Sequence, residues 1–231
     1  MKVPWLSKEE ITGKARELLI EYENATGCLP EPPIPLEDVI QTHLGLKLAY
    51  MDFEKSLGLR GVLGATYVKA RLICVNRNLE QTGAEGRMAF TCAHEVGHWI
   101  LHRRFVDAAG RSEGRESGIL CRSADAREAI EWQADFFAAC LLMPEDKVRE
   151  AFRLVWNAGS LVITNRRSAL GGTALCVDPC VENWPLVADM VCEAGNFRNV
   201  SKQAMIIRLQ ELGLVANLAG EEIGWKNRSA G

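Results

Sequence analysis

The sequence predicts an α+β fold that is mainly helical and contains a small three-stranded sheet. Apolar residues recur at helical spacing in several segments, whereas residues 46–76 alternate in polarity and are rich in β-branched side chains, which is typical of strands. The chain has 231 residues, of which 48% are hydrophobic and 25% charged, so it can bury a proper core. We expect a main domain over residues 1–155 and a smaller one over residues 156–231.

The first predicted helix runs from Ser7 to Tyr22. Ser7 and Glu10 have the spacing of a capping box, in which each side chain accepts a hydrogen bond from the other residue's backbone N–H. The apolar positions at helical spacing are Ile11, Ala15, Leu18, Leu19 and Tyr22. A proline-rich linker over residues 30–35 precedes a short helix that is expected to end at Gly45.

Three strands are expected next, over residues 46–50, 61–68 and 72–76. A second capping box, Thr82 with Glu85, then opens a helix that continues to about residue 101.

Residues 106–123 are dense in Gly, Ser, Arg and Glu and predict a loop. The following helix, with Asp125 and Glu128 at its start, runs to Leu142, and Pro144 suits the first turn of a further helix.

The net charge, the first ten residues and the length of the apolar runs bear on which partners and which compartment to expect. A formal net charge of -3 gives no basic excess of the kind that a nucleic-acid backbone attracts, so direct nucleic-acid binding is not expected. The first ten residues lack a signal-peptide core, and the longest apolar run, residues 136–144, is too short to span a bilayer. We therefore expect a cytoplasmic protein without a membrane partner.

The eight cysteines are scattered, several of them within apolar segments. In a reducing compartment they are expected to be small buried residues rather than disulfides. Cys176 and Cys180 leave a second metal site open beside simple packing, although no matching pair follows them.

The residues with the clearest chemistry are His94-Glu95-Val96-Gly97-His98 on the long helix. Residues four apart lie about one turn apart on the same helix face, so the two imidazoles can bind one ion together. Zinc accepts imidazole nitrogens, and a catalytic site needs three protein ligands and one open position. Glu95 projects beside that position, where a carboxylate can take a proton from water and pass it to a leaving nitrogen.

A third ligand is expected from Glu131, in the stretch Glu131-Trp132-Gln133-Ala134-Asp135. Asp135 lies on the same helix face and can accept a hydrogen bond from the outer nitrogen of one histidine, which fixes the orientation of that ring. The small side chains of Ala134, Ala138 and Ala139 would let this helix approach the histidine helix closely. A solvated acidic face with alanine packing is the alternative interpretation.

Two further residues have weaker assignments. His102 continues the histidine face, but the angular drift over eight residues turns it away from the shared ion, so a second-shell or structural role is expected. A donor that stabilises the oxyanion is also wanted, and Tyr67 and His102 are the candidates.

Residues 87–102 (RMAFTCAHEVGHWILH) and 131–144 (EWQADFFAACLLMP) resemble, in order and in separation, the two motifs of the ImmA/IrrE family of metallo-endopeptidases. The resemblance covers most of residues 7–155. It implies a zincin-like peptidase domain and, in that family, site-specific cleavage of a helix-turn-helix repressor that relieves repression of mobile-element or stress-response genes.

On this sequence the resemblance makes His94, His98 and Glu131 the zinc ligands and Glu95 the general base. Asp135 stands where an asparagine is often found in the family, and either side chain can accept from an imidazole. Manganese or iron could occupy the same ligands in the cell.

The C-terminal part resembles the family more loosely. Residues 200–214 are similar to its helix-turn-helix-like end, and residues 158–181 look like an insertion. Acidic residues outnumber basic ones over residues 181–215, which favours a packing or substrate-recognition module over a DNA reader.

A second hypothesis from another class stays open. The chain could be a regulatory protein that binds a repressor or DNA without cutting and holds a structural zinc, in which case a fourth protein ligand would close the site.

Overall fold

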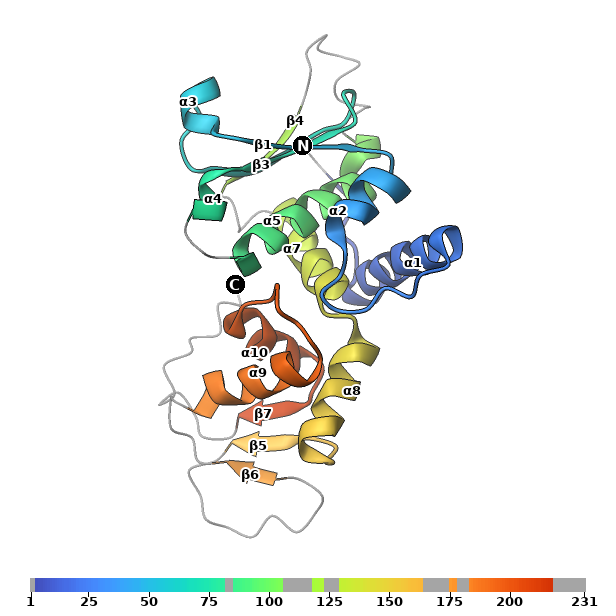
Figure 1. Ribbon diagram of the computed structural model, residues 1–231, viewed down its shortest axis with the longest axis vertical. Coiled ribbons are helices and arrows are strands. Elements are labelled where there is room, and N and C mark those ends of the chain that lie inside the picture. The colour runs from blue at the N-terminus through green and yellow to red at the C-terminus, as the bar shows by residue number, and fades with distance from the viewer. Residues whose placement is uncertain are drawn as a thin grey trace. The chain divides into compact units, whose positions relative to one another are not determined.

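The structure is a computed structural model and describes residues 3–81, 85–105, 118–122, 129–163, 175–177 and 183–217. The chain forms two compact units, Met1–Pro144 and Glu145–Gly231, which are described separately (Figure 1). The division falls earlier than the boundary expected after residue 155. The reason is that helix α8 (Glu145–Trp156) packs against α9 (Asn183–Ala194), so it belongs with the second unit.

The first unit contains all of the elements that position the predicted site. In chain order they are α1 (Lys8–Thr26), α2 (Leu36–Asp38), the π-helix η1 (Val39–His43), β1 (Lys47–Met51), α3 (Phe53–Leu57), β2 (Val62–Tyr67), β3 (Leu72–Asn76), α4 (Asn78–Gln81), α5 (Glu85–Gly97), the π-helix η2 (His98–His102), β4 (Gly118–Arg122) and α7 (Ala129–Leu142).

Helix α1 forms as its sequence predicts. The Ser7 backbone N–H donates to Glu10 Oε2 at 2.7 Å, and the Glu10 N–H donates to Ser7 Oγ at 3.2 Å, which confirms the capping box. Gly27 ends the helix at a positive φ of 70°. The buried face consists of the predicted residues Ile11, Ala15, Leu18, Leu19 and Tyr22. This face packs against α7, so α1 supports the helix that carries Glu131.

The three predicted strands are present, and a fourth extends their sheet. The strand order is β1-β3-β2-β4, with β1 parallel to β3 and the other pairs antiparallel. Strand β4 lies within the segment predicted as a loop. Its apolar residues 119–121 form a run too short to stand out among the surrounding Gly, Ser and charged residues, and only pairing with β2 makes it a strand.

The two faces of this sheet have different neighbours. Helix α5 contacts β2 and β3 on one face (Figure 1). A cluster of Phe53, Val62, Ala65 and Cys74, with Tyr67 packed against it, forms a separate core. The sheet therefore separates the histidine helix from a second apolar layer.

Some of the predicted helix boundaries lie outside the residues that the structure describes. The long helix is present as α5 followed by η2, whereas its proposed cap Thr82 lies outside the described residues, as do Asp125 and Glu128. Helix α7 ends at Leu142, and α8 begins directly after Pro144.

The second unit contains α8, β5 (Leu161–Ile163), β6 (Leu175–Val177), α9, α10 (Lys202–Glu211) and β7 (Val215–Asn217). The three strands form a parallel sheet of order β6-β5-β7, so the predicted insertion supplies two of its strands. Helices α9 and α10 pack together, but residues 195–201 connect them, which is longer than the three- or four-residue turn of a helix-turn-helix. The helix-turn-helix resemblance stays a prediction.

Two other expectations concern membranes and cysteines. In the described part of the chain, no helix combines the length and hydropathy needed to cross a bilayer. Cys28, Cys74, Cys92, Cys140 and Cys192 are not joined in disulfides. The side chains of Cys176 and Cys180 lie outside the described residues.

Candidate metal centre

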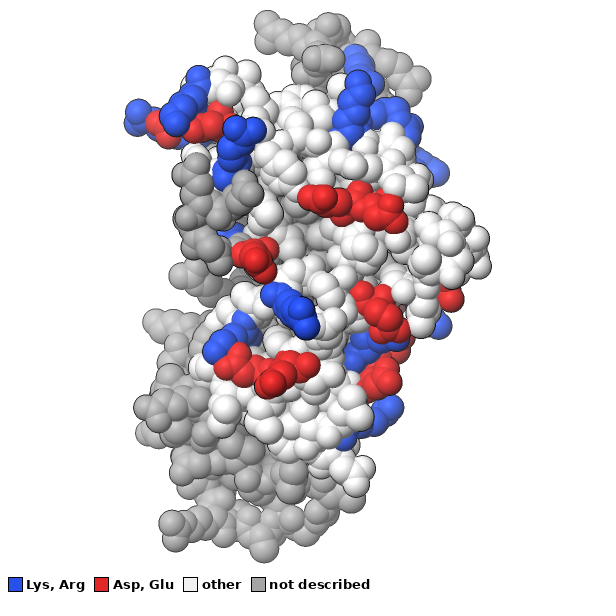
Figure 2. All heavy atoms as spheres, viewed as in Figure 1, with Lys and Arg blue, Asp and Glu red and all other residues white. Residues whose placement is uncertain are grey.

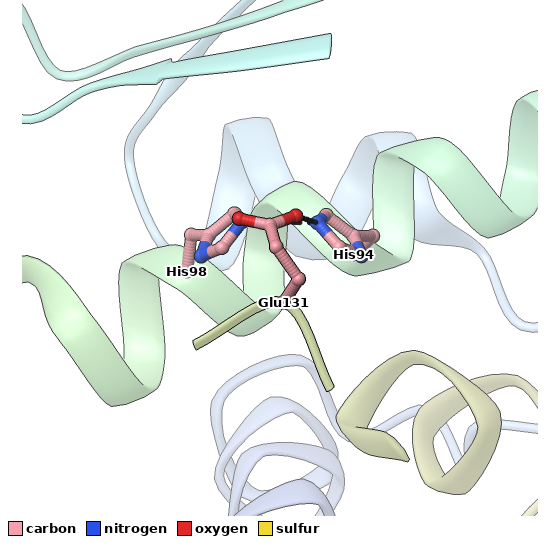
Figure 3. A group of neighbouring side chains, drawn as sticks. All are labelled: His94, His98 and Glu131. Carbon is pink, nitrogen blue, oxygen red and sulfur yellow. Dashed lines mark hydrogen bonds and ion pairs between the residues drawn. The ribbon is translucent and has the colours of Figure 1, made fainter. Parts of the chain in front are cut away.

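His94 and His98 lie one turn apart where α5 passes into η2, and their rings turn toward Glu131 at the start of α7 (Figure 3). The two Nε2 atoms are 2.9 Å apart. Glu131 Oε2 lies 3.2 Å from His94 Nε2, and Glu131 Oε1 lies 3.4 Å from His98 Nε2. All three side chains are buried, so the structure brings the predicted ligands together in a site shielded from solvent.

Close contact between two helices places Glu131 there. Gly97 and Ala134 face each other where α5 meets α7, and a Cβ on Gly97 would lie 3.2 Å from the Ala134 Cα. Ala134 and Ala138 are fully buried, as the prediction of a slim helix requires, whereas Ala139 is partly exposed. The role of Gly97 was not predicted, although a glycine inside a helix is a signal of close approach.

The outer nitrogen of each histidine has a partner. His94 Nδ1 lies 2.8 Å from Asp135 Oδ1, as expected for an acceptor that fixes the ring. His98 Nδ1 lies 3.0 Å from His102 Nδ1, which places His102 directly behind His98 rather than among the three converging side chains. The predicted second-shell residues are thus both adjacent to the site.

The donor set fits a divalent metal such as zinc. A carboxylate can only accept a hydrogen bond, so the ring hydrogen of His94 sits on Nδ1 and is donated to Asp135. The lone pair of His94 Nε2 then faces His98 and Glu131. Two imidazole nitrogens and a carboxylate, with their ligand atoms within 4.8 Å of one another, match the ligands that Zn²⁺ takes in catalytic sites.

The ionisation states also suit metal binding. Burial opposes ionisation of Glu131, but the adjacent rings of His94 and His98 outweigh it and lower the pKa of Glu131 to about 2. Burial lowers the pKa of His98, against the opposing effect of Glu131. A neutral imidazole beside an ionised carboxylate is the form in which both bind a metal.

Glu95 lies beside the ligands on α5 but points toward strand β2. It is fully buried, and its Oε2 accepts a hydrogen bond of 2.6 Å from Thr66 Oγ1. Its Oε1 has no hydrogen-bond partner among the described residues. Burial raises the pKa of Glu95 to about 8, although His94 and the Thr66 hydrogen bond act in the opposite direction. A cation at the ligands would favour the ionised form.

Strand β2 makes room for this carboxylate. A Cβ on Gly64 would lie only 2.4 Å from Glu95 Oε1, so no other residue fits there without moving Glu95. Gly64 and Thr66 lie two apart and share the face of the strand that meets α5. Sequence reasoning missed both, and the glycine inside a predicted strand was the available signal.

The predicted oxyanion donor Tyr67 is not brought to this site. Tyr67 follows Thr66, and successive strand residues point to opposite faces, so its side chain packs with the Phe53 cluster instead. His102, the other candidate, is occupied between His98 and Gln133.

Comparison with known proteins gives the family. The sequence matches Peptidase_M78, the IrrE N-terminal-like domain, over residues 41–159, which is just over half of the chain. The chain belongs to this family. The Peptidase_M78 match includes both helices of the candidate metal centre and confirms the resemblance found in the motifs. Membership supports a function of the zinc metallopeptidase type. No match was found among curated proteins.

Proposed function

We propose that the protein is a zinc-dependent endopeptidase that cleaves a helix-turn-helix transcriptional repressor and so derepresses mobile-element or stress-response genes. One observation carries the proposal: within a Peptidase_M78 domain, three buried donors converge beside a buried glutamate that has one oxygen without a partner among the described residues.

His94, His98 and Glu131 would hold the metal, with zinc as the expected ion and manganese or iron as ions that suit the same ligands. A zinc ion bound there would supply Lewis acidity, which can polarise the scissile carbonyl and make water nucleophilic at neutral pH.

Glu95 is the proposed general base. Its Oε1 would accept a proton from the attacking water and deliver it to the leaving amide nitrogen. Thr66 keeps Oε2 in place during both transfers, because its hydroxyl is itself buried and donates to that oxygen.

The number of ligands favours an enzyme over the alternative, a regulatory protein with a structural zinc. Among the described residues, the group able to hold a metal has three members. Catalytic zinc sites keep three protein ligands and one open position, whereas structural sites are closed by four.

The substrate is expected to bind as an extended segment of a repressor added along an edge of the first sheet. Strand β4 is one such edge and pairs with β2, the strand that carries Gly64 and Thr66. This edge strand therefore pairs directly with the strand that faces Glu95.

The second unit would then serve packing or substrate recognition rather than DNA binding. Its basic side chains include Arg149 and Lys202, which pair with Glu145 and Asp189. On the face drawn in Figure 2, blue and red spheres lie side by side over the described part of this unit. Paired charges of this kind leave little positive potential for phosphate.

The test is co-expression with a helix-turn-helix repressor encoded next to this protein, followed by mass spectrometry of the repressor. The wild type should cut at one site. Glu95→Gln should retain zinc, measured by elemental analysis, and lose at least about a hundredfold in cleavage rate. Glu9→Gln, on the exposed face of α1, is the matched control and should cut normally. Undiminished cleavage by Glu95→Gln, or zinc-loaded wild type that binds the repressor without cutting, would overturn the proposal.

A further inference from the structure

The candidate ligand His98 is connected through two buried side chains to the N-terminal segment. His98 Nδ1 lies 3.0 Å from His102 Nδ1, and His102 Nε2 lies 3.1 Å from Gln133 Oε1. Gln133 Nε2 in turn donates to the backbone carbonyl of Pro4 at 3.1 Å. The series spans η2, α7 and the residues that precede α1.

The direction of each hydrogen bond follows from its last member. A carbonyl oxygen only accepts, so Pro4 fixes the amide of Gln133 with Nε2 toward it and Oε1 toward His102. Oε1 also only accepts, so the hydrogen of His102 sits on Nε2. The Nδ1 of a neutral His102 then carries a lone pair and must receive the hydrogen on His98 Nδ1.

We propose that Gln133 and His102 are positioning residues that fix the tautomer of His98. Together with the carbonyl of Pro4 in the N-terminal segment, they form a hydrogen-bond relay that ends at His98. The proposal rests on the role of His98 as a metal ligand in the proposed function. With its hydrogen held on Nδ1, His98 presents the lone pair of Nε2 to the point shared with His94 and Glu131.

Because its side chains are buried, the relay depends on its own members for every hydrogen bond. Gln133 is 0% exposed and His102 is 1% exposed, so solvent cannot replace a lost partner. His94 is fixed differently, by the charged side chain of Asp135, which is 41% exposed. One ligand is therefore oriented by a carboxylate at the surface and the other by a neutral interior chain.

Aromatic stacking holds the N-terminal segment against α7. Trp5 stacks on Trp132 with ring centroids 4.9 Å apart and an interplanar angle of 11°, and Trp132 stacks on Phe136 at 5.6 Å. Trp132 lies between Glu131 and Gln133 in sequence, so the stack anchors the carbonyl of Pro4 beside the amide that it orients.

The alternative arrangement shows what the relay prevents. Without an acceptor at Gln133, His102 can carry its hydrogen on Nδ1 and donate to His98 Nδ1. The hydrogen of His98 then moves to Nε2, the atom that must bind the metal. Loss of such outer partners typically costs about 10–100-fold in metal affinity.

The first test reads the tautomers directly in zinc-free protein, by NMR of the ¹⁵N-labelled histidine rings. The wild type should show His98 with hydrogen on Nδ1 and His102 with hydrogen on Nε2. The opposite tautomer at His98 in the wild type would overturn the proposal.

The second test compares zinc affinity by competition with a chelator. His102→Asn keeps an acceptor near the position of Nδ1 and should stay within a few-fold of wild type, whereas His102→Leu and Gln133→Met should weaken binding by about 10–100-fold. Equal affinities for the Asn and Leu variants would contradict the relay.

The contribution of the N-terminal segment is tested by deleting residues 2–5, with Ile11→Val as the control. The deletion should weaken zinc binding several-fold, because the Gln133 amide loses its anchor. Ile11→Val removes a buried methyl from the adjacent α1 and should lower stability without changing zinc affinity. A deletion that binds zinc like the wild type would remove this segment from the proposal.

These readouts separate the relay from the proposed function, because none of them needs a substrate. An intact relay without repressor cleavage would count against the peptidase alone. Glu95-dependent cleavage with unchanged tautomers in Gln133→Met would count against the relay alone.

Discussion

At the scale of single residues, the two oxygens of the Glu95 carboxylate have different surroundings. Thr66 donates to Oε2, while Oε1 faces the space that Gly64 leaves open. A base that must receive and release a proton needs one free oxygen and a fixed orientation, and the Thr66 hydroxyl supplies the orientation.

We expect Thr66→Val to lower kcat by about 10–100-fold, because a hydrogen bond to a charged group contributes about 1.5–3 kcal/mol. Zinc content should not change, since the Thr66 hydroxyl donates to Glu95 and not to the candidate ligands His94, His98 and Glu131. Thr66→Ser keeps the hydroxyl and is the control. Equal kcat values for the Val and Ser variants would show that Thr66 does not position Glu95.

Asp135 provides a second prediction at this scale. Asp135→Asn keeps an acceptor for His94 Nδ1, whereas Asp135→Ala removes it. Chelator competition should show a loss of zinc affinity of about 10–100-fold for Ala and a much smaller loss for Asn. If both substitutions have the same effect, the negative charge rather than the hydrogen bond is what His94 requires.

At the scale of elements, the crossing of α5 and α7 sets the distance between the histidines and Glu131. We expect Gly97→Ala to destabilise the protein by about 1–3 kcal/mol, because the new methyl meets the backbone of Ala134 and the helices must separate. Zinc affinity should fall as well, since Glu131 lies one turn before Ala134 on the helix that moves.

Gly13→Ala on α1 is the matched control for this substitution. A Cβ at Gly13 has no neighbour within 4 Å, so the change should raise the free energy of unfolding, by up to about 1 kcal/mol. Thermal or urea denaturation with zinc titration measures both effects. Unchanged zinc binding in Gly97→Ala would mean that the crossing tolerates the methyl.

The elements also show how far the sequence predicts this structure. Helix α1 was predicted with its cap and its buried face, because local spacing and Ser7–Glu10 determine both. The π-helix η2 was not predicted. Over four residues an α-helix drifts by about 40°, whereas the wider turn of a π-helix, closed by i→i+5 bonds, changes that offset. This region brings His102 Nδ1 within 3.0 Å of His98 Nδ1, and no local pattern indicates it.

The residues of the candidate site also fall into those that local motifs predict and those that depend on tertiary contacts. His94, Glu95 and His98 follow from spacing on one helix, and Glu131 from a second motif. Gly64, Thr66 and Gln133 act through contacts between elements, such as the hydrogen bond from Gln133 to Pro4, which links residues 129 apart. Such partners depend on tertiary packing, so the sequence alone did not reveal them.

At the scale of the whole molecule, the metal would join two helices of the first unit. We expect zinc to stabilise this unit by about 2.7 kcal/mol at a free concentration of 100 times Kd. Hydrogen exchange measured by mass spectrometry should rise in α5 and α7 after chelation, with little change in α9 and α10. An equal rise in both units would contradict a site confined to the first.

The second unit was the least predictable part of the chain. Strands β5, β6 and β7 have three residues each, too few to show an alternating pattern, and they pair in parallel across long separations in sequence. The domain boundary near residue 155 was predicted from the extent of the resemblance to the family. In the structure α8 packs on α9, so the second unit begins at Glu145.

The stacked indoles of Trp5 and Trp132 give the protein a built-in optical signal. Two indole rings with centroids 4.9 Å apart couple their strong electronic transitions, so circular dichroism in the far ultraviolet should contain a paired positive and negative band from them. Trp132 adjoins Glu131, and this band would therefore register, without any added dye, whether the start of the chain is docked beside the metal centre.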